Sequence, residues 1–241
     1  DDDDDDGATS YQTHSESESR AKKQSKDSVK ICVVESDEMA RKLYGYLHFQ
    51  ESISLCVRPK PATISNFPTW LRERILQAKK QKGLVFLMLN RVVKSENLGT
   101  LFRMALRYKV NGIILGKGCT DPYYRRSLLE SRVATLQIPL FFLKHDKDWN
   151  VVVRSFQDND IIIAGLSPNA RLGCELLVRE SKQHRGVGIL VGNEYDGLDD
   201  AVAKYADVRL KIDMRASAID SLNVAVAVGI ALNKLADAAA C

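Results

Sequence analysis

From residue 83 onward, six short apolar runs alternate with longer amphipathic stretches, and this alternation limits the fold more than any other feature. The runs cover 84–89, 112–115, 138–143, 161–164, 187–191 and 208–212. Helical spacing is found near 98–109, 122–134, 148–157, 173–183, 199–205 and 220–238. Strands that are apolar throughout must be covered on both faces, so the pattern predicts an α/β fold, a parallel sheet with helices on both faces. Ligands of such sheets bind beyond the carboxyl ends of the strands.

The chain before residue 83 has a different texture. Residues 1–27 contain nine acids and almost no apolar side chains, which predicts a disordered acidic tail. Residues 28–82 predict a small N-terminal extension with a strand over 29–34 and a helix over 37–49. A second helix should follow Pro61, with Asn66 as its cap and an apolar face formed by Trp70, Leu71, Ile75 and Leu76. The α/β domain then occupies 83–241.

Charge is distributed unevenly along the 241 residues. The net charge is +4, but residues 1–27 carry −5, so the remainder carries +9. Residues 58–109 alone hold twelve Lys or Arg and two acids. A basic body of this kind fits a polyanionic partner such as nucleic acid, although basic surfaces also serve solubility alone. The extension 28–82 is compatible with RNA recognition or with a helix packed for stability. Arg125, Arg126 and Arg132 are compatible with a solvated surface or with a surface that faces RNA.

Several classes of protein are not expected. No run reaches the roughly 18 to 20 apolar residues of a membrane-spanning helix, and no secretory leader is visible. The five cysteines and four histidines are scattered, which predicts neither a disulfide framework nor a metal site and fits a reducing compartment. We therefore expect an intracellular, cytoplasmic protein, with an organelle left open. The Gly116-Lys117-Gly118 segment matches neither a Rossmann fingerprint nor a P-loop and predicts a turn.

Three polar segments follow predicted strands or begin predicted helices. They are Ser95-Glu96-Asn97-Leu98-Gly99-Thr100-Leu101-Phe102-Arg103, then Ile189-Leu190-Val191-Gly192-Asn193-Glu194-Tyr195-Asp196-Gly197-Leu198, and finally Ile212-Asp213-Met214 with Asp220-Ser221-Leu222-Asn223-Val224-Ala225-Val226-Ala227. Taken singly, each has an ordinary structural explanation. Asn97 and Ser221 are compatible with helix N-caps, Glu194 with a capping carboxylate and Gly192 with a turn.

In this order and spacing, the three segments resemble the motifs of the SpoU (TrmH-like) family of SPOUT RNA 2′-O-ribose methyltransferases. The resemblance covers about residues 84–238. It implies a C-terminal deep trefoil knot, a pocket for S-adenosylmethionine (SAM) formed by the knotted loops, and a homodimer whose active site lies near the subunit interface. It also implies transfer of a methyl group to a ribose 2′-hydroxyl of tRNA or rRNA, with no metal and no membrane partner.

The resemblance also assigns roles to individual residues. The polar active-site positions match Arg103, Asn97, Glu194, Ser221 and Asn223. The cofactor-binding positions match Gly165, Leu166, Gly192, Ile212, Met214 and Leu222. Because a guanidinium is effectively always protonated, we expect Arg103 to hold a phosphate and stabilise alkoxide charge, and not to act as a base. Two alternatives stay open: a non-catalytic knotted RNA-binding relative, and a methyltransferase that modifies a base.

Three positions depart from the family pattern. Asp213 replaces a usual Pro, Val133 replaces a Gly in a Ser-x-Gly-Ala element, and Asp199 replaces a Ser. None of these is a residue to which we assign chemistry. Asp213 and Val133 affect the expected shape of the pocket and the RNA contact.

Overall fold

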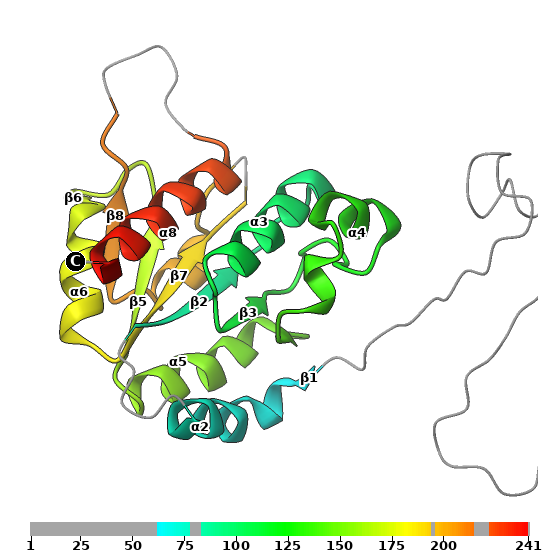
Figure 1. Ribbon diagram of the computed structural model, residues 1–241, viewed down its shortest axis with the longest axis horizontal. Coiled ribbons are helices and arrows are strands. Elements are labelled where there is room, and N and C mark those ends of the chain that lie inside the picture. The colour runs from blue at the N-terminus through cyan, green and yellow to red at the C-terminus, as the bar shows by residue number, and fades with distance from the viewer. Residues whose placement is uncertain (1–61, 78–82, 194–195, 215–221, 241) are drawn as a thin grey trace, which may run out of the picture. The chain divides into compact units, whose positions relative to one another are not determined.

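A parallel sheet with helices on both faces forms the part of the chain that the structure describes, as the sequence predicts (Figure 1). The structure is a computed structural model and describes residues 62–77, 83–193, 196–214 and 222–240. All of them belong to one compact unit. The predicted tail 1–27, strand 29–34 and helix 37–49 lie outside the described residues.

Eight strands pair in the order β1-β4-β3-β2-β7-β5-β8-β6, and every pairing is parallel. Their bounds are β1 Ala62–Thr63, β2 Leu84–Leu89, β3 Gly112–Leu115, β4 Leu140–Phe142, β5 Ile161–Leu166, β6 Leu172–Gly173, β7 Gly186–Val191 and β8 Val208–Lys211. The central strands β2 and β7 are almost entirely buried. This burial explains why these strands are apolar throughout and show no alternation.

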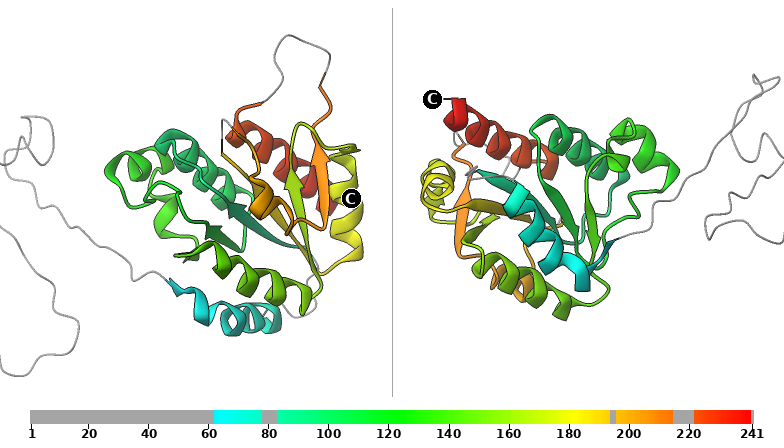
Figure 2. Two further views of the ribbon diagram at one scale, coloured as in Figure 1. Left: turned by 180° about the vertical axis from the view of Figure 1, so that it is seen from behind. Right: turned by 60° about the horizontal axis from the view of Figure 1, so that its bottom comes forward.

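The helices cover the sheet from two sides (Figure 2). Their bounds are α2 Phe67–Gln77, α3 Ser95–Arg107, α4 Arg125–Ser131, α5 Trp149–Gln157, α6 Glu175–Gln183, α7 Asp200–Ala203 and α8 Val224–Ala240. Leu87 and Leu89 of β2 join one core cluster with α3, α6 and α8. Phe86 and Met88 join a second cluster with α2, α5 and α7. Because successive side chains of a strand point to opposite faces, α2 and α3 lie on opposite sides of the sheet.

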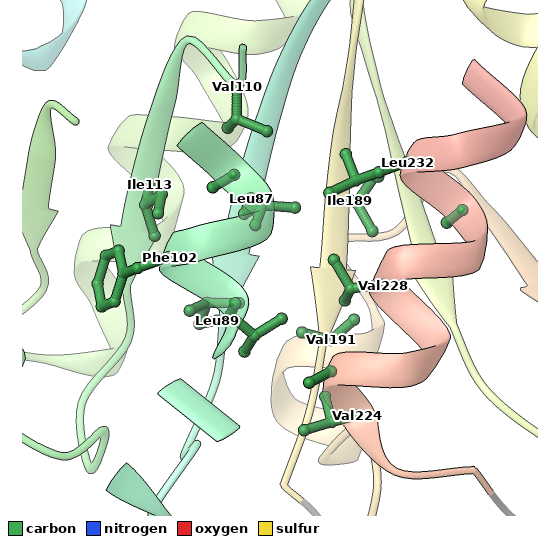
Figure 3. Packing of buried hydrophobic residues seen from close by; sticks show 14 of the residues in the cluster. Leu87, Leu89, Phe102, Val110, Ile113, Ile189, Val191, Val224, Val228 and Leu232 are labelled. Atoms are coloured by element: carbon green, nitrogen blue, oxygen red, sulfur yellow. The ribbon is translucent and has the colours of Figure 1, made fainter. Parts of the chain in front are cut away.

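The first cluster joins α3 and α8 over β2 and β7 (Figure 3). Phe102 of α3 and Val228 of α8 are fully buried in it. The amino ends of both helices are thereby fixed near the carboxyl ends of the central strands. The first and third polar segments of the sequence come together at this edge of the sheet.

Helix α2 packs on the second cluster although it precedes the boundary that we expected at residue 83. Phe67 and Leu71 are fully buried, and the ring of Phe67 meets that of Phe141 edge-on at 4.9 Å between centroids. Asn66, the predicted cap, is the last residue of a 3₁₀ helix, Ile64–Asn66, that runs directly into α2. The prediction that Leu76 belongs to the apolar face is wrong, because its side chain is 76% exposed. Leu76 lies nine positions after Phe67, and nine steps of about 100° place it on the opposite face of the helix.

Element ends differ from the prediction where short-range geometry decides them. Strands β2 and β3 have the predicted bounds, whereas the two-residue strands β1 and β6 were not predicted. Helix α4 covers 125–131 and not 122–134, because Arg132 and Val133 adopt left-handed conformations with φ of 47° and 57°. A β-branched residue at positive φ is strained, which accounts for the glycine that the family pattern has at this position.

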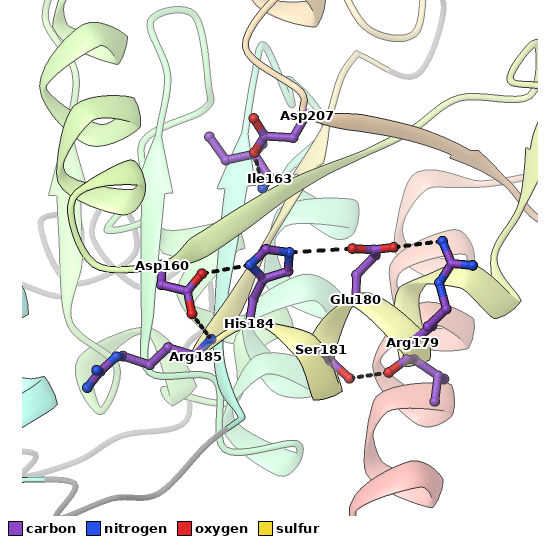
Figure 4. A network of polar contacts seen from close by, with 9 residues as sticks. Asp160, Ile163, Arg179, Glu180, Ser181, His184, Arg185 and Asp207 are labelled. Atoms are coloured by element: carbon purple, nitrogen blue, oxygen red, sulfur yellow. Dashed lines mark hydrogen bonds and ion pairs between the residues drawn. The ribbon is translucent and has the colours of Figure 1, made fainter.

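A polar network lies at the amino ends of β5 and β7 (Figure 4). His184 Nδ1 is 2.7 Å from Asp160 Oδ1, and its Nε2 is 3.5 Å from Glu180 Oε2. Asp160 also accepts a hydrogen bond from the backbone N–H of Arg185 at 3.2 Å. The hydrogen bond with His184 lowers the pKa of the Asp160 carboxyl group below its ordinary value. This network lies at the edge opposite the carboxyl ends of the strands, so it stabilises the fold away from the ligand-binding edge.

No helix among the described residues is long and apolar enough to cross a membrane. The same residues contain no group of three His, Cys, Asp or Glu side chains arranged to hold a metal ion.

Candidate functional site

A pocket opens beyond the carboxyl ends of β5, β7 and β8, where the sequence predicted the ligand to bind. Its volume is about 360 Å³, within the ~300–1,000 Å³ range of small-molecule sites. The lining combines apolar, polar and charged side chains of three post-strand segments and the start of α8. The lining residues are Leu166, Ser167, Pro168, Asn169, Val191, Gly192, Asn193, Asp196, Gly197, Leu198, Asp200, Arg209, Leu210, Ile212, Met214, Leu222, Val224 and Ala227.

The turn after β7 forms one wall of this pocket and closes on itself. Asn193 and Gly197 exchange two backbone hydrogen bonds of 2.9 and 3.0 Å. A Cβ atom at Gly192 would lie 1.8 Å from the carbonyl oxygen of Gly197, so this position admits no side chain. Gly197 has φ of +71°. The closest neighbours of a Cβ atom at Gly192 are thus atoms of the same turn.

Five of the six predicted cofactor-binding residues line the pocket, namely Leu166, Gly192, Ile212, Met214 and Leu222. Gly165 does not line it. Gly165 pairs with Leu190 of β7 on one side and with Arg209 of β8 on the other. A Cβ atom on Gly165 would meet Leu198 at 3.1 Å, so this glycine admits close packing beneath the pocket wall.

A side-chain hydrogen bond connects the first and third polar segments. The amide Nδ2 of Asn223 donates to Oδ1 of Asn97 over 2.9 Å, across 126 residues of sequence. Oδ1 of Asn223 accepts from the backbone N–H of Ala225 at 2.8 Å, so Asn223 caps α8. The interpretation of Asn97 as an N-cap is wrong, because Asn97 is the third residue of α3 and its side chain is buried. Of these two asparagines, Asn223 is the helix N-cap, at the start of α8.

The other predicted catalytic residues are placed differently. Arg103 is exposed on α3 and does not line the pocket. Glu194 and Ser221 lie outside the described residues. Gly99, one turn before Arg103, packs directly on α4, where a Cβ atom would come within 2.8 Å of the backbone nitrogen of Ser131. This contact fixes α3 against α4 and thereby the direction of its exposed face.

Two of the three family departures have defined contacts near the pocket. Asp199 accepts from the backbone N–H of Ala201 at 2.9 Å, which caps α7, and it pairs with Arg91 at 3.2 Å. Asp213 is exposed and pairs with Lys211 at 3.1 Å. Asp199 thus keeps the capping function available to a Ser and adds an ion pair to the loop after β2.

Sequence reasoning missed several residues of the pocket, above all Ser167, Asn169, Asp196 and Arg209. The loop after β5 was the available signal, because Ser, Pro and Asn follow a buried strand there. Within the described part of 58–109, the basic residues of the two helices do not share one face of the sheet. Arg72 and Arg74 lie on α2, whereas Arg103 and Arg107 lie on α3 across the sheet.

Known proteins are similar to this chain in sequence and in fold. The chain is 33% identical over 137 residues to an uncharacterized tRNA/rRNA methyltransferase of Mycobacterium tuberculosis, covering 56% of this chain and 46% of the relative. It is 26% identical over 158 residues to the 23S rRNA (guanosine(2553)-2′-O)-methyltransferase RlmP of Bacillus subtilis, covering 66% and 58%. A solved AdoMet-bound rRNA methyltransferase of Sinorhizobium meliloti matches with a TM-score of 0.57 and 27% identity, over 65% of this chain and 57% of that one.

The match to the family is extensive, whereas the curated relatives are longer proteins. The chain spans about half the length of the mycobacterial relative, which is 46% covered. Residues 84–233 match the SpoU rRNA Methylase family, a range that contains the pocket and the Asn97–Asn223 hydrogen bond. This chain therefore belongs to the SpoU rRNA Methylase family.

Proposed function

We propose that this protein is a SAM-dependent RNA methyltransferase that transfers a methyl group to a ribose 2′-hydroxyl of tRNA or rRNA. The hydrogen bond between Asn97 and Asn223 is the observation that carries the proposal. It joins two polar segments beside a pocket that most of the expected cofactor residues line. The 2′-O specificity is supported by the activity for which RlmP of Bacillus subtilis is named, and the RNA class by the names of the curated relatives.

The pocket fits SAM in size and in chemistry. Leu166, Leu198 and Ile212 offer apolar surface for an adenosine, and the lining holds both acidic and basic side chains for a zwitterionic amino acid. The AdoMet-bound relative of Sinorhizobium meliloti supports the same assignment. The chemistry that SAM supplies when bound is an electrophilic methyl group. The residues of this chain must then position the weakly nucleophilic hydroxyl and accommodate its charge.

Each polar residue has a task in this scheme. Arg103, exposed on α3, binds the phosphate beside the target ribose and stabilises negative charge that develops on the 2′-oxygen. The proton leaves to a phosphate oxygen or to water. Asn97 and Asn223 hold α3 and the start of α8 in register, and Glu194 and Ser221 complete the polar group. Positioning of this kind contributes up to roughly 7–11 kcal/mol in favourable cases.

The homodimer and the C-terminal knot belong to the same proposal. Met214, Leu222 and Val226 expose 43%, 36% and 49% of their surfaces around the pocket and the start of α8, which favours coverage by a second copy. Three chain segments that follow β5, β7 and β8 gather around one pocket, which supports a knotted arrangement. Arg103 does not line the pocket of its own chain, so a homodimer that brings α3 of a second copy to each pocket would complete the site.

The test is methyl transfer to cellular tRNA and rRNA by the purified protein, with SAM affinity measured in parallel by calorimetry. Arg103→Ala should abolish transfer and leave SAM affinity nearly unchanged, because the partner of Arg103 is the RNA. Arg103→Lys should restore little, since an ammonium lacks the planar fork of a guanidinium. Absence of SAM binding by the wild type, even with RNA present, would favour the non-catalytic alternative. Methylated bases as the products would favour the base-modifying alternative.

A further inference from the structure

Three neighbouring loops beyond the carboxyl ends of β2, β3 and β4 are rich in basic residues. Arg91 and Lys94 follow β2, Lys117 follows β3, and Lys144 and Lys147 follow β4. The same loops hold three acids, Asp121, Asp146 and Asp148, so their net charge is about +2. All five basic side chains belong to exposed residues. The strands pair in the order β4-β3-β2 and all run parallel, so the three loops lie side by side at one edge of the sheet (Figure 1). Adjacent strands are about 4.8 Å apart, so this basic edge spans roughly 10 Å.

Hydrogen bonds fix the first two loops to each other. The backbone N–H of Gly116 donates to the carbonyl of Leu89 at 2.7 Å, and that of Thr120 donates to the carbonyl of Val92 at 2.9 Å. The hydroxyl of Thr120 also donates to the carbonyl of Val93. The basic side chains after β2 and β3 therefore project from one ordered unit, which reduces the entropy lost when they bind a ligand.

The third loop is ordered by an internal cap. The carboxylate of Asp148 accepts from the backbone N–H groups of Lys144 and His145, each at 2.9 Å. This engagement orders the turn and leaves both lysine side chains exposed. Among the described residues, no acidic side chain forms an ion pair with Lys117, Lys144 or Lys147.

The same edge of the sheet changes sign on the other side of β2. The turn after β7 carries Asp196 and Asp199, and Asp200 begins α7 directly after it. Asp213 follows β8. The loop after β5 contributes a single base, Arg171. Arg209 and Lys211 of β8 offset part of this negative charge, and Lys211 pairs with Asp213 at 3.1 Å. A polyanion that reaches the pocket would therefore meet net attraction over β2, β3 and β4 and net repulsion at the turn after β7.

We propose that the RNA substrate leaves the methyl-transfer site over β3 and β4, with its phosphates bound by Lys117, Lys144 and Lys147. This inference rests on the proposed function and adds a direction to it. The three lysines act as phosphate contacts that position the RNA and do not read its sequence. Arg91, held by Asp199 at 3.2 Å, lies where this RNA path meets the turn that lines the pocket.

The experiment compares two triple variants of the full chain that lose the same charge. The first is Lys117→Gln, Lys144→Gln, Lys147→Gln on the proposed path. The second, the matched control, is Arg154→Gln, Lys182→Gln, Lys204→Gln, which alters exposed bases away from the three loops and the pocket. Binding to unfractionated cellular tRNA and to fragmented rRNA is measured against salt concentration, and SAM binding is measured on the same samples by calorimetry.

Each phosphate contact contributes about 0.7–0.9 to the slope of log affinity against log salt. In the first variant, the slope of log affinity against log salt should therefore decrease in magnitude by about 2 to 3. Its RNA affinity at 0.1 M salt should fall by roughly 100-fold or more, with SAM binding unchanged. The control should keep the wild-type slope. A wild-type slope in the first variant, or an equal loss in the control, would overturn the inference. The proposed function fails on a different observation, the absence of SAM binding or of methyl transfer by the wild type.

Discussion

Disrupting the hydrogen bond between Asn97 and Asn223 should destabilise the protein by a predictable amount. We consider Asn97→Ala, Asn223→Ala and the double variant. Asn223→Ala removes two interactions, the 2.9 Å bond to Asn97 and the 2.8 Å cap of α8, whereas Asn97→Ala removes the first of these. The two single variants should therefore differ in their cost.

The structure sets the magnitudes. A hydrogen bond contributes about 0.5–1.5 kcal/mol net, and loss of an N-cap costs about 1 kcal/mol. Asn223 is exposed, so in Asn97→Ala its amide can donate to water instead. The free energy of unfolding should therefore fall by about 1 kcal/mol. Asn97 is only 7% exposed, so Asn223→Ala loses the cap and also leaves a buried acceptor without this donor, for about 2–3 kcal/mol. The coupling energy between the two sites should be about 1 kcal/mol.

Urea denaturation of the four proteins gives this coupling energy directly. Asn223→Asp serves as the control, because a carboxylate still caps α8 but has no N–H to donate to Asn97. It should lose about 1 kcal/mol and keep the cap. Since Leu222 and Val224 line the pocket on either side of Asn223, SAM affinity should fall in each variant that loses the bond. Additive costs, with a coupling energy within about 0.3 kcal/mol of zero, would refute the reasoning.

Three further predictions follow from single positions. Gly192→Ala would place a methyl group 1.8 Å from the Gly197 carbonyl oxygen, so calorimetry should detect no SAM binding, and unchanged affinity would show that the turn can move. Val133→Gly should raise the free energy of unfolding by up to about 1 kcal/mol, because relief of φ 57° (about 1–2 kcal/mol) outweighs glycine's entropy cost; a lower urea midpoint would contradict this. The His184 contact lowers the pKa of Asp160 below 3.8. The wild type should therefore have a higher free energy of unfolding than Asp160→Asn above pH 3.8, and this difference should disappear as the pH falls through the lowered pKa. Urea midpoints at a series of acidic pH values test this, and a difference that does not shrink would argue against it.

The sequence predicted the sheet because its strands are defined by continuous burial. Leu84–Leu89 is nearly inaccessible to solvent, so every position must be apolar and the run has clear ends. Two-residue strands such as Ala62–Thr63 leave no such pattern, because they form only through pairing with β4. Helix α4 ends because Arg132 and Val133 adopt left-handed conformations. Neither Arg nor Val favours that conformation, so the residue types do not indicate where the helix ends. The exposure of Leu76 follows from helix geometry that a list of apolar residues ignores.

The candidate site was predicted from motifs, and the structure supplies contacts that motifs do not contain. Leu166, Gly192, Ile212, Met214 and Leu222 line one pocket. A motif does not reveal which of its asparagines caps a helix, because capping depends on where the helix begins. That assignment, Asn223 and not Asn97, required the three-dimensional structure. The basic residues of α2 and α3 belong to one basic stretch of the sequence but lie on two faces of the sheet, since β2 lies between the two helices.

The activity that we propose for this chain is methylation of ribose in RNA, with Arg103 as an essential residue. The most direct measurement is mass spectrometry of nucleosides from cellular tRNA and rRNA, incubated with SAM and either the wild-type protein or Arg103→Ala. We expect 2′-O-methylated nucleosides with the wild type and none above background with the variant, while both proteins bind SAM. Methylation confined to bases, or equal ribose methylation by both proteins, would contradict it.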